Sequence, residues 1–210
     1  MHESPRAPSV DGDAPPLIRV QDLSQFRLPD HFRGRSAIVV VLWWLVRDTL
    51  FLASPQPLYG FRNWLLRLFG AKIGKNVIIR STARVTYPWK LTIADNAWVG
   101  DFVELYTLGE IYIGESACVS QNAYICTGSH DLRAVGFDIF AKPIRIEAEA
   151  WVASDVFVAP GVTVGRGAVV GARSTLLGDA PPYAILAGYP ARIVGSRDPS
   201  AKPGDGAEAA

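Results

Sequence analysis

Between Ile146 and Leu176 the chain has an aliphatic residue at every sixth position. These residues are Ile146, Val152, Val158, Val164, Val170 and Leu176. Four positions after each of the first five comes a small or branched residue, namely Ala150, Val156, Val162, Ala168 and Ser174. A period of six fits neither an α-helix nor a simple strand alternation. It is typical of hexapeptide repeats, in which three short strands form each coil of a parallel β-helix.

The same ladder continues upstream in three sets, with a step of eight instead of six between sets. The sets are Ile73, Ile79 and Val85; Ile93, Val99 and Leu105; and Ile113, Val119 and Ile125. The longer step predicts two extra residues at one corner of the prism. Three hexads make one coil, so the sequence predicts a mainly β fold with about five coils between residues 73 and 181. The aliphatic residues should stack inside the prism as its core.

Two segments before the first coil have a helical pattern. In residues 36–53 an unbroken apolar run from Ala37 to Val46 is interrupted by Arg47 and Asp48. A membrane span needs roughly 20 apolar residues, and a central charge pair would be costly. The pattern therefore favours a helix that packs on the side of the prism or lies in a membrane interface.

The second helical segment, residues 58–69, has apolar residues at three- and four-residue spacing. They predict one buried stripe made of Phe61, Trp64, Leu65, Leu68 and Phe69. Gly70 is suited to the C-cap of this helix.

The ladder fails once, between Ile125 and Ile146, where the intervening chain is too long for a corner and must leave the prism as a loop. At its base lies the segment Thr127-Gly128-Ser129-His130-Asp131. Long irregular loops on a regular scaffold tend to be functional.

These patterns divide the chain into five parts. They are a mobile arm (1–22), a helical segment (23–72), the β-helix (73–181) with its extruded loop (126–145), a C-terminal segment (182–197) and a disordered tail (198–210). The arm has no cationic start followed by an apolar run, so we expect no signal peptide. We expect a cytoplasmic protein, at the inner face of the membrane if the apolar helix contacts lipid.

Composition narrows the function classes. The net charge is +1 and 49% of the residues are hydrophobic, so nothing indicates a nucleic-acid partner. Cys118 and Cys126 form neither a disulfide framework nor a metal motif. Of the histidines His2, His31 and His130, only the last lies in the coil region. A zinc-dependent β-helix enzyme would need three histidine ligands from the coils, so we expect no metal.

Several motifs carry a resemblance to a known family. The excursion opened by His130 is followed by K-P-I-x-I-E, W-V-A-S, A-P-G-V-T-V-G and A-G-Y-P-A-R, and together with the hexads this resembles the hexapeptide-repeat O-acetyltransferases that use acetyl-CoA. The segments Leu42-Trp43-Trp44, Leu65 to Gly74, Glu104-Leu105-Tyr106 and Cys126 to Asp131 resemble the colanic-acid biosynthesis branch. The resemblance covers about residues 25 to 195.

The resemblance implies a left-handed β-helix, a homotrimer with active sites between subunits, and acetyl-CoA as cosubstrate. The acceptor would be a hydroxyl of a sugar or glycan intermediate in exopolysaccharide-type biosynthesis, attacking the thioester directly. A base must remove the hydroxyl proton, and a histidine is suited to this role. His130 is therefore the candidate general base.

An acid could hold this base in one tautomer. Successive coils are offset by 20 residues (Ile93 to Ile113), which places Glu110 one coil below His130. Glu104 and Asp131 are alternatives. The resemblance places Glu104, Tyr106 and Asp131 near the acceptor, although relatives have an amide-bearing residue at the position of Tyr106.

For the cofactor, the resemblance indicates a set of small residues with one tryptophan and one arginine: Trp151, Ala153, Ser154, Ala172, Gly188 and Arg192. Arg192 would bind the nucleotide phosphates, and the Ser154 N–H would stabilise the oxyanion. Relatives have a Thr- or Ser-Lys-Asp turn where this chain has Leu177-Gly178-Asp179, so one cationic contact is missing. Alternatives are a non-sugar acceptor such as serine, an acyl-carrier-protein-dependent acyltransferase, or a non-catalytic scaffold.

Overall fold

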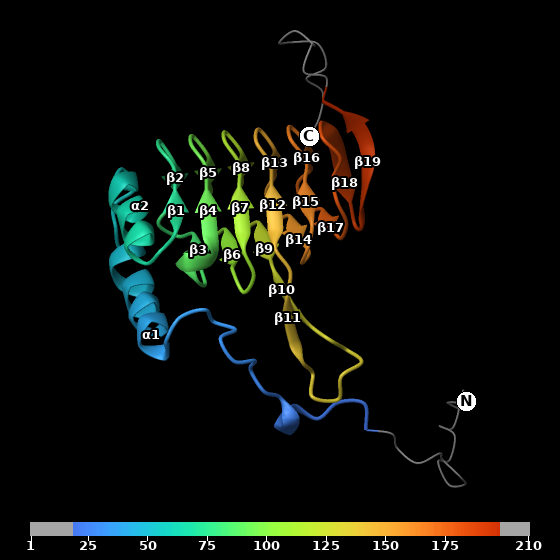
Figure 1. Ribbon diagram of the computed structural model, residues 1–210. Helices are drawn as coiled ribbons and strands as arrows, with labels where there is room; N and C mark the ends of the chain where they lie inside the picture. Colours follow the sequence, from blue (N-terminus) through green and yellow to red (C-terminus); the bar gives the residue numbers. More distant parts are fainter. Residues whose placement is uncertain (1–18, 198–210) are drawn as a thin grey trace, which may run out of the picture.

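The protein is a left-handed parallel β-helix with a helical cap at its N-terminal end (Figure 1). The computed structural model describes residues 19–197. The predicted mobile arm lies outside the described residues except for positions 19–22, and the predicted tail lies outside them entirely.

Three parallel sheets form the walls of the prism. The first contains β1 (Lys72–Ile73), β4 (Leu91–Ile93), β7 (Ile111–Ile113), β12 (Ile144–Ile146) and β15 (Thr163–Val164). The second contains β2 (Ile78–Ile79), β5 (Trp98–Val99), β8 (Cys118–Val119), β13 (Trp151–Val152), β16 (Val169–Val170) and β18 (Ala184–Gly188), with β19 (Ala191–Ser196) antiparallel at its edge. The third contains β3 (Arg84–Val85), β6 (Glu104–Tyr106), β9 (Tyr124–Cys126), β14 (Phe157–Val158) and β17 (Thr175–Leu176).

The aliphatic ladder is the core of the prism, as predicted. Its residues stack in register through the coils, for example Ile93 on Ile113 and Ile146 on Val164. Each ladder residue is at most 9% exposed. The five complete coils match the predicted number, and β18 adds part of a sixth. The longer corner is also present, because a 3-10 turn (Pro88–Lys90) joins β3 to β4.

The corners explain which residues the hexads require. A Cβ atom on Gly114 would lie 2.4 Å from the Ala148 nitrogen, so the next coil approaches this corner too closely for any side chain. Other corner residues have left-handed backbone, with φ of 53° at Asn76 and 60° at Asn96. Asparagine tolerates this conformation better than most residues, and the Asn76 amide donates a hydrogen bond to the Asn96 side chain.

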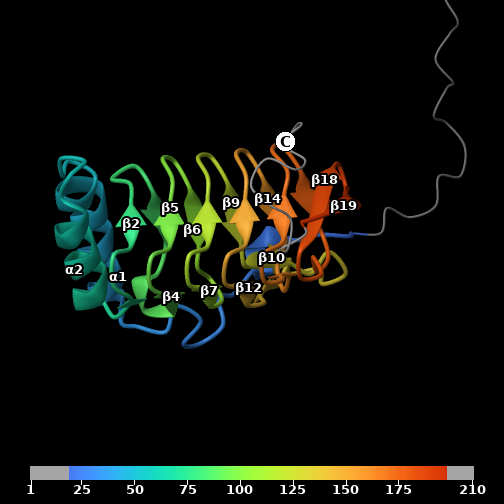
Figure 2. The same ribbon diagram turned by 90° about the horizontal axis from the view of Figure 1, so that it is seen from above.

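Two helices, α1 (Ala37–Val46) and α2 (Tyr59–Leu68), cover the end of the prism (Figure 2). A π-helical turn (Arg47–Phe51) extends α1. The Trp43 indole N–H donates a 2.9 Å hydrogen bond to the Val85 carbonyl, and its ring packs against Phe51 and Phe69. The first helix therefore packs on the end of the prism and not on its side.

The predicted buried stripe of α2 is wrong in part. Leu65 is buried as predicted, but Trp64 and Leu68 are 53% and 64% exposed. The helix instead turns Arg62 and Asn63 toward the prism, because their side chains donate hydrogen bonds to the carbonyls of Ile79 and Val77 in the first coil. Gly70, with a φ of 93°, ends the helix as expected.

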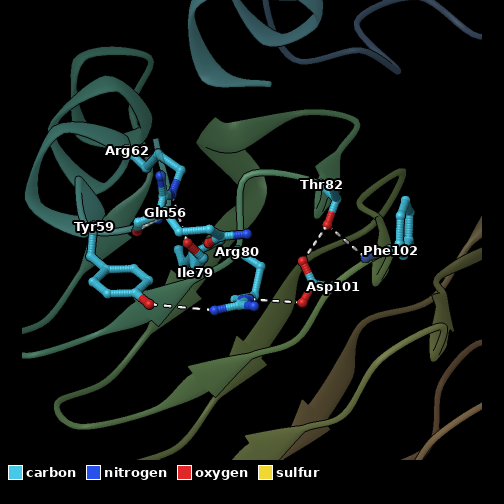
Figure 3. Close-up of polar contacts among 8 residues, drawn as sticks. All are labelled: Gln56, Tyr59, Arg62, Ile79, Arg80, Thr82, Asp101 and Phe102. Atoms are coloured by element: carbon cyan, nitrogen blue, oxygen red, sulfur yellow. Dashed lines mark hydrogen bonds and ion pairs between the residues drawn. The ribbon is translucent and has the colours of Figure 1, made fainter. Parts of the chain in front are cut away.

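Arg62 fastens this cap to the coils (Figure 3). Its guanidinium is fully buried and donates hydrogen bonds to the carbonyls of Ile79, Pro55 and Gln56 and to the Ser54 hydroxyl. Burial lowers the pKa of this guanidinium. Nearby, Arg80 forms an ion pair with Asp101 that links the first two coils.

We predict that Arg62→Ala lowers the free energy of unfolding by about 3–5 kcal/mol, because it removes a fully buried side chain and leaves the buried Ile79 carbonyl without its donor. The measurement is a thermal and urea denaturation series. The matched control is Arg173→Ala, because the Arg173 side chain is 86% exposed and lies 3.8 Å from Asp155. If both variants unfold like the wild type, the cap does not depend on Arg62.

Candidate active site

The excursion from the prism is a β-hairpin made of β10 (Gly128–His130) and β11 (Ile139–Ala141). Buried Thr127 fixes its base, since its hydroxyl donates to the Tyr106 carbonyl and accepts from the Gly109 N–H, while its carbonyl accepts from the Lys142 N–H. A side chain on Gly128 would force Leu108 to move, because a Cβ there would lie 2.5 Å from the Leu108 side chain. The predicted loop thus begins and ends as ordered strands.

His130 lies at the end of β10, between two aromatic rings. Its imidazole stacks on Phe137 with 4.0 Å between ring centroids and 10° between planes. The Phe26 ring lies 6.0 Å away at a steeper angle. The Nδ1 atom lies 2.7 Å from the Phe137 carbonyl oxygen. A carbonyl can only accept a hydrogen bond, so Nδ1 carries the proton and Nε2 of the neutral ring is the basic nitrogen.

Phe137 owes this position to an unusual backbone conformation. Its φ is 56°, in the left-handed region that bulky residues rarely adopt. Strain of this kind persists where the surrounding structure imposes it, and it gathers at functional sites. Here it brings the ring and the carbonyl of one residue onto His130 together.

The N-terminal segment before α1 supports the hairpin from outside. A 3-10 turn (Leu23–Gln25) is capped by the Asp22 carboxylate, which accepts hydrogen bonds from Ser24 and Gln25. These hydrogen bonds lower the pKa of the Asp22 carboxyl. The Asp22 N–H donates to the Val135 carbonyl at the hairpin tip. Sequence reasoning missed Phe26 and Phe137, because no local pattern links either residue to His130.

Within residues 19–197, none of the three acids predicted as partners of His130 (Glu104, Glu110 and Asp131) forms a hydrogen bond or an ion pair with its imidazole. The Asp131 carboxylate accepts from the Arg133 N–H within the loop. Glu110 is exposed and lines a hollow with Lys72, Lys90 and Arg145. The 20-residue offset does not reach His130, because the chain leaves the prism just after the register pair Tyr106 and Cys126.

Glu104 and Tyr106 lie on the outer face of the third sheet, at the foot of the hairpin. Glu104 is in register with Arg84 and Tyr124, and the rings of Tyr106, Tyr124 and Phe157 follow one another at 6.0 and 5.7 Å. Burial raises the pKa of the Glu104 carboxyl, although Arg84 and Arg47 oppose the shift. Burial also raises the pKa of Tyr106.

The residues considered for the cofactor gather along one corner of the prism. Trp151 lies in register with Val169, and Val169 with Ile185. Ser154, Ala172 and Gly188 each follow one of these residues by three positions on successive coils, and the Gly188 N–H donates to the Ser174 hydroxyl. We call Ser154, Ala172 and Gly188 the small-residue column. Within residues 19–197 the Ser154 N–H has no hydrogen-bond partner, whereas those of Ala153 and Asp155 bond to the Val170 and Gln121 carbonyls.

Trp151 and Arg192 flank this column. Trp151 is 38% exposed, and its indole N–H donates to the Ser120 hydroxyl at 2.9 Å. Arg192 lies on β19 opposite Ala187 and is exposed. In the segment Leu177-Gly178-Asp179, which replaces the lysine-containing turn of relatives, Asp179 accepts a hydrogen bond from the Thr163 N–H and Leu177 is 62% exposed.

His130 and the small-residue column lie at different corners of the prism. The column follows the second sheet, between β13 and β14, while the hairpin follows the third sheet, between β9 and β12. One chain therefore does not bring the candidate base and the candidate cofactor residues together. No group of three or more His, Cys, Asp or Glu that could hold a metal occurs between residues 19 and 197.

Solved structures with this architecture define the class as hexapeptide-repeat acetyltransferases. A Vibrio cholerae hexapeptide-repeat acetyltransferase in complex with acetyl-CoA superposes with a TM-score of 0.71 at 25% identity, over 79% of this chain and 92% of that one. The galactoside acetyltransferase in complex with coenzyme A shares the fold, with a TM-score of 0.64 at 21% identity over 81% and 84% of the two chains.

Sequence relatives identify the branch. The putative colanic acid biosynthesis acetyltransferase WcaF of Escherichia coli K12 is 57% identical over 178 residues, which cover 85% of this chain and 98% of the relative. The galactoside O-acetyltransferase of the same organism is 28% identical over 63% of this chain and 67% of its own length. No family model matches. The chain belongs to the colanic acid biosynthesis acetyltransferase family.

We predict that the neutral His130 ring carries its proton on Nδ1 and none on Nε2, because the Phe137 carbonyl oxygen beside Nδ1 can only accept a hydrogen bond. Long-range proton–nitrogen correlation spectra of ¹⁵N-labelled protein, at a pH where the ring is neutral, distinguish the two tautomers. The spectrum of His130→Gln assigns the signal, and exposed His31 provides an internal comparison. A ring protonated on Nε2 would show that the Phe137 contact does not set the tautomer.

Proposed function

We propose that this protein transfers the acetyl group of acetyl-CoA to a hydroxyl of a sugar or glycan intermediate in exopolysaccharide biosynthesis. The observation that supports this most strongly is His130, held through Nδ1 with Nε2 available, in a chain of an acetyltransferase family. The relatives named for galactoside and colanic acid indicate a sugar hydroxyl over a non-sugar acceptor.

In the proposed reaction His130 acts as general base. Nε2 takes the proton of the acceptor hydroxyl while the hydroxyl oxygen attacks the thioester carbonyl. The resulting imidazolium is stabilised because its Nδ1–H bond to the Phe137 carbonyl becomes charge-assisted. The tetrahedral intermediate then expels the coenzyme A thiolate, which receives the proton from Nε2, and the acetyl ester remains on the sugar.

Acetyl-CoA would lie along the small-residue column. Ser154, Ala172 and Gly188 allow an extended pantetheine arm to approach the backbone, with Trp151 beside it and Arg192 available to the phosphates. The Ser154 N–H, which has no partner within residues 19–197, would donate to the developing oxyanion. Glu104 and Tyr106, at the foot of the hairpin, and Asp131 would contact the acceptor.

We further propose that the protein is a homotrimer in which His130 of one subunit works on acetyl-CoA held by the next. The separation of the hairpin and the column at two corners of one prism supports this arrangement. A neighbouring copy would supply the column that each hairpin lacks, and closed cyclic symmetry satisfies all three sites at once.

We predict that wild-type protein releases coenzyme A only in the presence of a sugar or sugar-nucleotide acceptor. His130→Ala should reduce this rate by roughly 10²-fold or more, as expected for loss of a general base. His31→Asn is the matched control and should behave as wild type, because His31 is exposed, has a φ of 61°, and asparagine tolerates that backbone. An unchanged rate in His130→Ala would refute the assignment of the base.

The shared site makes a separate prediction. His130→Ala and Ala172→Trp subunits should each be inactive alone, the second because a tryptophan blocks the column. In trimers formed by co-expressing equal amounts, about a quarter of the sites combine an intact base with an intact column, so about a quarter of the activity should return. No recovery, with mixed trimers verified by mass spectrometry, would place the whole site within one subunit.

A further inference from the structure

Helix α1 is apolar on two opposite faces, and the prism covers only one of them. Val40 and Trp43 are completely buried against the coils. On the other side Ile38, Val41 and Leu45 are 80%, 59% and 60% exposed. Their spacing of three and four residues places them on one helical face. None of the helices between residues 19 and 197 could span a bilayer.

Helix α2 extends the same surface. Arg62 and Asn63 turn toward the coils, which leaves Trp64 and Leu68 exposed on the outside. Leu42 of α1 and Leu68 of α2 line one shallow hollow together with Arg35, so the two apolar faces are continuous. We call this surface the apolar end-face. It comprises Ile38, Val41, Leu42, Leu45, Trp64 and Leu68.

The end of the molecule that bears this surface is basic. Residues 27–84 contain ten Lys or Arg and only two acids, although the net charge of the whole chain is +1. Asp48, one of the two acids, is paired with Arg47. Exposed Arg35 stands at the rim of the hollow. An apolar patch bordered by cations is complementary to the headgroups and acyl chains of an anionic lipid surface.

The charge also argues against a second copy of the chain as the occupant. Two copies joined through the same patch would bring two basic ends together, and like charges across an interface are unfavourable. Large exposed apolar patches rimmed by polar residues mark interaction sites.

We propose that the apolar end-face docks this protein on an anionic lipid surface, with α1 lying in the headgroup region. This surface lies on the outer side of the end cap and contains no residue of the hairpin or of the small-residue column. The inference goes beyond the proposed function and would bring the site close to acceptors attached to lipid.

The test is flotation of the full-length protein with vesicles of phosphatidylcholine, alone or mixed with phosphatidylglycerol. Wild type should bind the mixed vesicles at least about tenfold more strongly than the neutral ones, and added salt should weaken this binding. The double variant Val41→Glu/Leu45→Glu should lose at least about tenfold of the binding. Arg35→Gln should lose roughly fivefold, as expected for one cation near an anionic surface.

Two controls separate the contributions. Val41→Gln/Leu45→Gln removes the apolar contacts without adding charge and should still weaken binding. Val194→Glu, at a position 66% exposed on β19 at the opposite end of the prism, should bind as wild type. Circular dichroism verifies that every variant is folded.

Two outcomes would overturn the proposal. One is wild-type binding that is absent, or equal on neutral and anionic vesicles. The other is a sedimentation experiment without lipid in which the wild type forms a larger assembly than the double glutamate variant. That result would show that the apolar end-face is a contact between copies of the chain. Neither flotation nor sedimentation requires acetyl transfer. The lipid-binding proposal can therefore be tested even if the proposed acetyltransferase function is wrong.

Discussion

Each coil of this protein is held in place by direct stacking on the coils next to it, and the rest of the structure depends on that contact. Stacked aliphatic residues fill the narrow interior of the prism, and neighbouring backbones approach each other at the corners so closely that only glycine fits at Gly114. An error in any one coil would displace all that follow, because stability in such a fold passes from neighbour to neighbour. The first coil has no neighbour below it, and the buried Arg62 and Trp43 of the helical cap take that place.

This regularity makes the one interruption informative. The hairpin leaves the prism at the longer corner and is fixed there by Thr127, so His130 has a defined position although it lies outside the coils. Phe137 then supplies both a stacking ring and a hydrogen-bond acceptor from a strained backbone. The small-residue column, in contrast, needs no such device, since the repeat places Ser154 and Ala172 on successive coils and β18 adds Gly188 beyond them. The proposed acetyl-CoA surface and the separately positioned candidate base are the two parts that the proposed trimer would join.

The sequence alone could predict the coils, their number, their core and the position of the excursion, because a six-residue period has one structural explanation. It could also have indicated the corner residues with positive φ, since Asn76 and Asn96 occupy equivalent hexad positions. The sequence pattern could not predict which residue contacts His130. The stacking offset that suggested Glu110 applies only inside the prism, and the Phe137 contact depends on a turn that no period describes. The buried face of α2 was misjudged for a related reason, because apolar spacing cannot reveal that Arg62 and Asn63 bond to coil carbonyls.

The central claim is that acetyl passes directly from acetyl-CoA to a hydroxyl that His130 deprotonates. Rapid-quench mixing of enzyme with an equal amount of acetyl-CoA, followed by intact-protein mass spectrometry, tests it most directly. The account predicts no acetylated protein at any time without acceptor, and formation of a sugar acetyl ester in step with coenzyme A release when acceptor is present. An acetyl group on His130 or Cys126 that forms without acceptor and then disappears when acceptor is added would contradict it.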